Sequence, residues 1–272
     1  MINRRKFIEV CATAMMLPTL ARSQTTKKNR WTSTELTSLN QSLAKLERTS
    51  GGRLGVSVLD TASGQIASYR GDERFMMLST FKTLAASYVL ARADRGDDKL
   101  NRRMQITQAD ILEHAPVTQR HLGPKGMTLA DLCQAAVTAS DNTAANLLHR
   151  SYGGPEALTQ FIRSLGDQVT RHDRYEPELN NPHPSEPMDT TSPNAMSRAL
   201  NTLVFGTTLR PESRHLLQSW LKGCITGDNR LRAGIPSNWG GAEKKRERPG
   251  SAQMMRALSS RPEGRPSWRQ SI

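Results

Sequence analysis

The residues best suited to chemistry in this chain are a serine and a lysine three positions apart, in Ser79-Thr80-Phe81-Lys82. An apolar run from Leu84 to Ala91 follows, so the pattern predicts a buried helix that Ser79 opens. Positions i and i+3 share a helix face, which would bring the Lys82 amine beside the Ser79 hydroxyl. A dry setting favours a neutral amine, so Lys82 could accept the proton of a serine nucleophile. The same pattern is also compatible with an ordinary helix start.

Two further polar motifs follow in order along the chain. Ser140-Asp141-Asn142 comes 61 residues after Ser79, and Glu176-Pro177-Glu178-Leu179-Asn180 lies in a long polar loop between residues 172 and 193. Each has a simpler interpretation on its own, because Ser140-Asp141-Asn142 could cap a helix and Glu176 could be a solvated loop carboxylate. The presence of all three motifs in one chain favours a catalytic site.

With these motifs the chain resembles the class A serine β-lactamases, in which S-x-x-K and S-D-N carry the chemistry. The resemblance runs from about residue 33 to Trp239. It also covers several framework segments, namely Arg74-Phe75, Leu90-Ala91-Arg92, Arg174, Asp189-Thr190-Thr191-Ser192-Pro193 and Trp220-Leu221-Lys222-Gly223. It implies an α/β fold of the β-lactamase/DD-peptidase type, with an all-α lobe and a sheet lobe flanked by helices. It also implies hydrolysis of a small-molecule β-lactam without a cofactor.

The resemblance implies how the acyl-enzyme would form. Ser79 would attack the β-lactam carbonyl. Lys82, or Glu176 acting through a water, would take the serine proton, and the resemblance leaves that choice open. Ser140 would relay a proton to the ring nitrogen as it leaves.

Other residues are implied in hydrolysis and binding. Glu176 and Asn180 would hold the water that hydrolyses the acyl-enzyme, and Asn142 would hydrogen-bond a substrate side-chain amide. Arg174 and Asp189 usually pair in this family and brace the loop that carries Glu176. As an isolated surface ion pair, the same two residues would contribute little stability.

Three positions depart from patterns known in the family. Leu78 and Ala86 stand where some relatives carry a cysteine, so we expect no disulfide from Cys133 or Cys224, and we expect two buried thiols instead. His114 stands where many relatives carry an aromatic residue at the mouth of the cleft. We therefore expect substrate stacking there to differ.

The family's third motif, Lys-Thr-Gly on an inner strand, is not at its expected place. Ala242-Glu243-Lys244 approaches it, but Lys245-Arg246 follows where Thr-Gly is expected. Residues 244–272 contain no Val, Phe or Tyr, and their one Ile is the last residue. We therefore expect the C-terminal strands of the sheet to be missing and residues 244–272 to form an aberrant, disordered basic tail.

A change of reading frame would explain this tail. Re-reading residues 244 onward in another frame, with permitted synonymous codons, can restore Lys-Thr-Gly followed by strand-like segments around Thr-Asn-Asp. The Asp of that reading is forced by Met254-Met255 rather than chosen. Sequencing the gene tests the hypothesis, which an intact frame without such a reading would contradict. Since one oxyanion-hole donor is worth about 10²–10³ in rate, we expect this chain to fold poorly and to be largely inactive.

The remaining pattern predicts how the chain is organised. Ser33 to Leu46 has the leucine stripe of an amphipathic helix, and residues 54–59 and 65–69 alternate like the strands of a hairpin. Residues 24–70 and about 220–243 are assigned to an incomplete α/β lobe, and residues 71–219 to an all-α lobe.

Residues 1–23 resemble an export signal, with Arg4-Arg5-Lys6 before an apolar segment and a cleavage site at Ala21-Arg22-Ser23. This signal, similar to a twin-arginine type, predicts a periplasmic location without a stable membrane anchor.

The net charge of +13 does not indicate a nucleic-acid partner. The first 30 residues contribute +6 and residues 240–272 contribute +5, so residues 31–239 carry only +2. The six histidines show no metal-ligand spacing, and no metal is predicted. We expect a monomer.

Two alternatives to an active β-lactamase follow from the same residues. A penicillin-binding DD-peptidase-like protein shares the serine–lysine chemistry but normally lacks the deacylating glutamate, so Glu176 argues against it. A non-catalytic protein with a damaged fold, which acylates slowly at most or acts as a basic-tailed binder, follows from the missing third motif. The fate of Ser79 after exposure to a penicillin distinguishes these possibilities.

Overall fold

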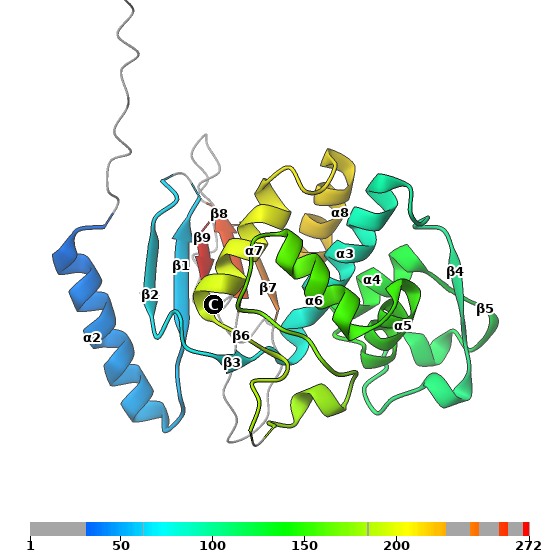
Figure 1. The fold of residues 1–272 in the computed structure, drawn as a ribbon, viewed down its shortest axis with the longest axis horizontal. Helices are drawn as coiled ribbons and strands as arrows, with labels where there is room; N and C mark the ends of the chain where they lie inside the picture. The colour runs from blue at the N-terminus through cyan, green and yellow to red at the C-terminus, as the bar shows by residue number, and fades with distance from the viewer. Residues whose placement is uncertain are drawn as a thin grey trace, which may run out of the picture.

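A computed structural model describes residues 31–226, except 62 and 184, together with the backbone of residues 240–244, 256–260 and 269–271. The chain forms a sheet with helices on both sides, and a larger helical lobe lies beside it (Figure 1). The helices are α2 (Ser33–Ser50), α3 (Phe81–Arg95), α4 (Leu129–Thr138), α5 (Asn142–Tyr152), α6 (Pro155–Ser164), α7 (Pro193–Phe205) and α8 (Pro211–Lys222). Short 3₁₀ turns are η1 (Leu78–Thr80), η2 (Gln108–Asp110), η3 (Thr118–Arg120) and η4 (Glu178–Asn180).

The N-terminal helix and hairpin confirm the sequence prediction. α2 begins at a capping box in which the Thr32 hydroxyl accepts from the Glu35 amide, and it ends at Gly51 in the left-handed region. β1 (Val56–Asp60) and β2 (Ile66–Tyr69) then pair in antiparallel register. No residue of α2 is fully buried, so the leucine stripe covers the edge of the sheet at β2 only partly.

The expectation that the C-terminal strands are missing is wrong for the backbone. β7 (Gly240–Lys244), β8 (Arg256–Ser260) and β9 (Arg269–Ser271) join the hairpin in an antiparallel sheet of order β2-β1-β9-β8-β7. A strand ladder is built from backbone N–H and C=O groups, and none of these three segments contains a proline, so low β-propensity does not prevent pairing. The other residues assigned to a disordered tail lie outside the described residues.

Two small sheets fix the long loop and the front of the helical lobe. β3 (Phe75–Met76) pairs with β6 (Thr190–Thr191), which ties the segment entering η1 to the end of the long loop. β4 (Arg103–Ile106) pairs with β5 (Gly123–Thr128) ahead of α4. In the part of the chain that is described, no helix is long and apolar enough to span a membrane.

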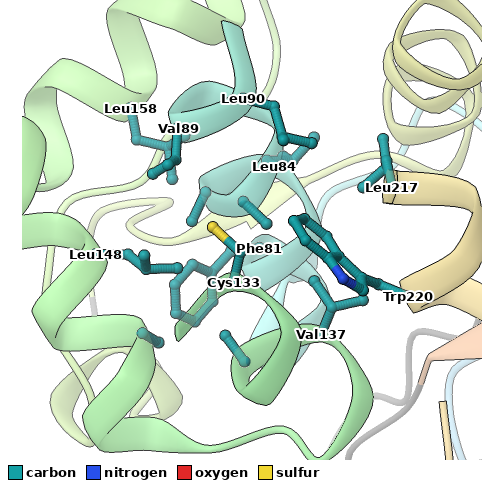
Figure 2. Close-up of a cluster of buried hydrophobic side chains, with 14 of the residues drawn as sticks. Phe81, Leu84, Val89, Leu90, Cys133, Val137, Leu148, Leu158, Leu217 and Trp220 are labelled. Atoms are coloured by element: carbon teal, nitrogen blue, oxygen red, sulfur yellow. The ribbon is translucent and has the colours of Figure 1, made fainter. Parts of the chain in front are cut away.

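One apolar core holds the helical lobe together, and α3 runs through it. Ten of its residues are buried, which explains why its sequence is apolar on nearly every face. Figure 2 shows α3 side chains such as Phe81 and Leu84 packed among residues of four other helices, including Cys133 from α4 and Trp220 from α8. The position of the helix that carries Lys82 is therefore determined by its packing in this core.

Candidate active site

Ser79 lies in η1, immediately before α3, and its side chain is buried. The residue before it, Leu78, has φ of +47°, a strained conformation for a branched side chain. Such strain persists only where surrounding packing enforces it, and it is concentrated at functional sites. The predicted proximity is confirmed, since Lys82 Nζ lies 3.2 Å from Ser79 Oγ.

Lys82 connects all the segments predicted to act together. Its amine donates to the Ser140 carbonyl at 2.8 Å and to Asn142 Oδ1 at 2.5 Å, and it lies 3.5 Å from Ser140 Oγ. It also forms an ion pair with Glu176 Oε1 at 3.0 Å, in which both side chains are fully buried. Because breaking a buried ion pair is strongly unfavourable, the position of each partner depends on the other.

In this geometry Lys82 contacts both Ser79 and Glu176, the two groups involved in the alternative routes for removing the serine proton. An ammonium has only donors, so in the form that donates to these oxygens Lys82 cannot accept from Ser79. The carboxylate of Glu176, in direct contact with Nζ, can take a proton from Lys82 and so free the amine lone pair. Glu176 is 2% exposed, so its interpretation as a solvated loop carboxylate is wrong.

Ser140 is held in an unusual backbone conformation between α4 and α5. Its φ is +60°, and the next residue, Asp141, braces this turn. The Asp141 carboxylate accepts from the Ala144 amide at 2.8 Å, from the amides of Val117 and Thr118 at 2.9 Å each, and from the Thr118 hydroxyl. The helix-cap interpretation is therefore confirmed for Asp141, while Ser140 and Asn142 face Lys82.

The loop that carries Glu176 is tied to α5, and we define the Glu176 loop as residues 171–181. Asn180 Nδ2 donates to Glu176 Oε2 at 2.5 Å, so the predicted pair is in contact. Asn146 of α5 clamps the backbone of Glu176, since its Nδ2 donates to the carbonyl at 2.8 Å and its Oδ1 accepts from the amide at 3.0 Å. Asn146 is not among the residues predicted from the sequence, although it lies in α5 together with Asn142.

Arg174 and Asp189 brace this loop as expected, but they are not a surface pair. Arg174 Nε lies 2.6 Å from Asp189 Oδ2, and Asp189 is buried. Its other oxygen accepts from the amides of Asp173 and Arg174 at 2.8 and 3.0 Å. Burial raises the pKa of Asp189, while these hydrogen bonds and Arg174 oppose the rise. The Asp189 carbonyl also accepts from the Met77 amide, which links the loop to the segment entering Ser79.

Other residues named from the sequence lie as follows. His114 is exposed, its carbonyl accepts from the Asn142 amide at 2.8 Å, and its Nε2 lies 3.1 Å from the Ala139 carbonyl. It therefore lies beside a predicted substrate-binding residue. Cys133 and Cys224 are separate buried thiols, and burial raises the pKa of Cys133.

The edge strand β7 occupies the position where the third motif was sought. It ends at Lys244 and lies alongside α8. The next residues in the sequence, Lys245-Arg246, lie outside the described residues. Within the described part of the chain, no group of three or more His, Cys, Asp or Glu side chains could hold a metal ion.

Comparison with known proteins gives consistent matches. The profile of a family described as the Beta-lactamase enzyme family matches residues 38–250. Beta-lactamase L2 of Stenotrophomonas maltophilia is 47% identical over 88% of this chain and 80% of its own length. Beta-lactamase Toho-1 of Escherichia coli is 43% identical over 87% of this chain and 78% of its own length. An ancestral class A β-lactamase structure matches with a TM-score of 0.82 and 51% identity, over 86% of this chain and 89% of that chain.

Proposed function

This chain belongs to the class A β-lactamase family, and we propose that its Ser79 opens β-lactam rings through an acyl-enzyme that Glu176 then hydrolyses. One observation carries the proposal. The Lys82 amine, buried on α3, contacts Ser79 Oγ at 3.2 Å, the Ser140 carbonyl at 2.8 Å and Glu176 Oε1 at 3.0 Å. These groups come from three separate segments of the chain, and a solely structural role does not require them to converge on one amine.

The first half of the reaction forms an ester on Ser79. Its Oγ attacks the lactam carbonyl carbon and loses its proton to Lys82, or to Glu176 through a water. The bond between that carbon and the ring nitrogen then breaks. Ser140, which lies beside Lys82, passes a proton to the nitrogen, so that the proton leaving serine is balanced by the one the amine gains.

The second half hydrolyses the ester and restores the serine. Glu176 accepts a proton from a water, whose oxygen attacks the ester carbonyl, and Ser79 leaves with a proton returned to it. Asn180, which donates to Glu176 at 2.5 Å, fixes the carboxylate that orients this water. Asn142 is proposed to bind the substrate side-chain amide, so it would contribute to affinity rather than to proton transfer.

We propose that turnover in this chain is limited by its C-terminal segment. The sequence continues from Lys244 as Lys245-Arg246 instead of Thr-Gly, and so lacks the residues that would bind the substrate carboxylate and extend the oxyanion hole. Loss of one such donor lowers the rate by about 10²–10³. The frame-change hypothesis predicts that a gene carrying the alternative reading would restore this activity.

Intact-protein mass spectrometry after incubation with benzylpenicillin tests the function. We expect Ser79 to carry an adduct of the mass of one penicillin that decays slowly. The adduct should be absent in the Ser79→Ala variant. No adduct on wild-type protein that circular dichroism shows to be folded would refute the proposal and favour a non-catalytic fold. A long-lived adduct with no hydrolysed product would favour the DD-peptidase-like alternative, against which the buried Glu176–Asn180 contact argues.

We also propose that the chain is exported as a monomer to the periplasm, with cleavage near Gln24. The support is the basic and apolar pattern of residues 1–23. N-terminal sequencing of protein recovered from a periplasmic fraction tests this. Retention of residues 1–23 in the recovered protein would contradict it.

A further inference from the structure

Two buried histidines that the proposed chemistry does not use face each other beneath the site. His149 comes from α5 and His172 from the Glu176 loop, and the two side chains are 0% and 1% exposed. Their Nε2 atoms are 2.9 Å apart, the length of a hydrogen bond. The pair therefore joins the helix that follows Ser140 to the loop that carries Glu176.

The surroundings decide which ring donates. A hydrogen bond between two Nε2 atoms requires a proton on one and a lone pair on the other. His172 Nδ1 lies 3.4 Å from Asp189 Oδ1, not aligned for a full hydrogen bond but close enough for electrostatic attraction. A proton on that nitrogen is attracted to the carboxylate, whereas a lone pair is repelled. The reverse assignment would also bury an Nδ1–H of His149 without a partner.

Ring packing places the pair directly against the helix of Lys82. Phe81 stacks on His172 with ring centroids 4.5 Å apart, and on His149 at 5.3 Å. Tyr175, the residue before Glu176, meets His149 edge-on. A shift of either imidazole would therefore alter the packing of Phe81 and Tyr175, the sequence neighbours of Lys82 and Glu176.

We propose that His149 and His172 form a positioning pair, with His149 donating from Nε2 to His172, that holds the Glu176 loop in register on α5. Asn146 is one helical turn before His149 on the same face, and it clamps the backbone of Glu176. α5 therefore contacts the loop at two points, through Asn146 on the backbone of Glu176 and through His149 on the side chain of His172. The consequence for deacylation rests on the proposed function, whereas the pairing itself does not.

The charges around the pair favour neutral rings. Lys82 and Glu176 face His149 with opposite signs, and the remaining titratable neighbours are Tyr152 and Tyr175. Burial, reinforced by Arg174, lowers the pKa of His172 to about 3, and burial also lowers the pKa of His149. Asp189, on the far side of His172, is already paired with Arg174. The hydrogen bond is thus maintained at neutral pH.

The test compares His149→Leu, His172→Leu and the double variant by amide hydrogen exchange. A single replacement leaves one buried imidazole without its partner, whereas replacing both rings leaves apolar packing. We expect exchange of the amides of residues 173–181 to be faster by roughly 10- to 100-fold in each single variant, relative to amides of α7, with much of this recovered in the double variant. His215→Leu, on the exposed face of α8, is the matched control. Unchanged loop exchange in both single variants, or purely additive effects, would overturn the proposal.

Two further measurements separate this proposal from the proposed function. Imidazole ¹⁵N shifts of wild-type protein at neutral pH should show His149 with the proton on Nε2 and His172 with the proton on Nδ1, and any other pair of tautomers would overturn the assignment. If Ser79 forms an adduct, the single variants should lengthen its lifetime several-fold more than they slow its formation. Equal changes in both steps would mean that the pair acts only on overall stability. Failure of wild-type protein to form an adduct would refute the proposed function, and the tautomers and loop exchange would still decide the pairing.

Discussion

Replacement of Asp189 should release the Glu176 loop, because this carboxylate has three strong hydrogen-bond donors. One oxygen accepts the amides of Asp173 and Arg174, and the other accepts Arg174 Nε at 2.6 Å. Asp189→Ala would leave two amides without their acceptor and the Arg174 guanidinium without its counter-charge. Each orphaned amide costs about 1–3 kcal/mol where water cannot reach it, whereas the Arg174 guanidinium, 23% exposed, can be partly rehydrated.

The two partners of this ion pair should not be equivalent. Arg174 keeps 23% of its side chain exposed, so in Arg174→Ala water can enter the vacated space and partly replace the guanidinium beside the Asp189 carboxylate. This replacement also leaves both amides bonded to Asp189. We therefore expect Asp189→Ala to lower the free energy of unfolding by about 3–5 kcal/mol and Arg174→Ala by about 1–2 kcal/mol.

Urea denaturation at pH 7, followed by circular dichroism, measures both values. Asp189→Asn is the matched control, because it keeps one oxygen for the two amides but loses the charge and the acceptor for Arg174 Nε. It should fall between the two alanine variants. If Arg174→Ala proves as costly as Asp189→Ala, the ion pair rather than the amide contacts holds the loop, which would refute the predicted difference between the two variants.

Three other predictions address the site, the histidine pair and one glycine. Glu176→Gln should lengthen the lifetime of the Ser79 adduct by about 10²–10⁴-fold, because it removes the base for deacylation, and mass spectrometry follows the decay; an unchanged lifetime would show that another group activates the water. Both histidines have a pKa below the ordinary 6.5 in the folded state, so the unfolded state binds more protons, and the free energy of unfolding should fall between pH 6.5 and 5 by up to about 2.7 kcal/mol per pH unit. The raised pKa of Asp189 acts in the opposite sense, and the slope should flatten in the His149→Leu/His172→Leu variant; an equal slope there would place the proton uptake elsewhere. Gly126→Ala should destabilise the β4–β5 ladder by about 1–3 kcal/mol, because φ is +46° and a Cβ would lie 1.8 Å from the Met104 carbonyl oxygen. If the variant melted at the same temperature as the wild-type protein, the close approach would be contradicted.

Much of the local structure could be predicted from the sequence. The leucine spacing predicted the helix that runs from Ser33 to Ser50, and alternation predicted the β1–β2 hairpin. Ser79 and Lys82 were correctly placed side by side, because an i, i+3 relationship on a helix is a local property. The C-terminal strands were missed because the prediction weighed side-chain propensity, whereas the ladder from β7 to β9 uses backbone groups.

Relations between distant segments were less accessible. Glu176 could be solvated or buried on sequence grounds, and its burial depends on Asn146 and Asn180 closing around it. His149 and His172 looked like unconnected histidines without metal-ligand spacing. Their contact follows from the packing of α5 against the loop, and a spacing of 23 residues does not predict it.

The sequence by itself determined the family and the identity of the chemical groups, because the nucleophile, its neighbouring amine and the loop carboxylate lie in short motifs that local geometry can interpret. It also showed that Thr-Gly does not follow Lys244. Only the tertiary structure decided that Lys82 contacts Ser140 and forms a fully buried ion pair with Glu176, and that two histidines join α5 to the Glu176 loop. The physical reason is that burial and long-range hydrogen bonds depend on the packing of whole elements, which no single segment encodes.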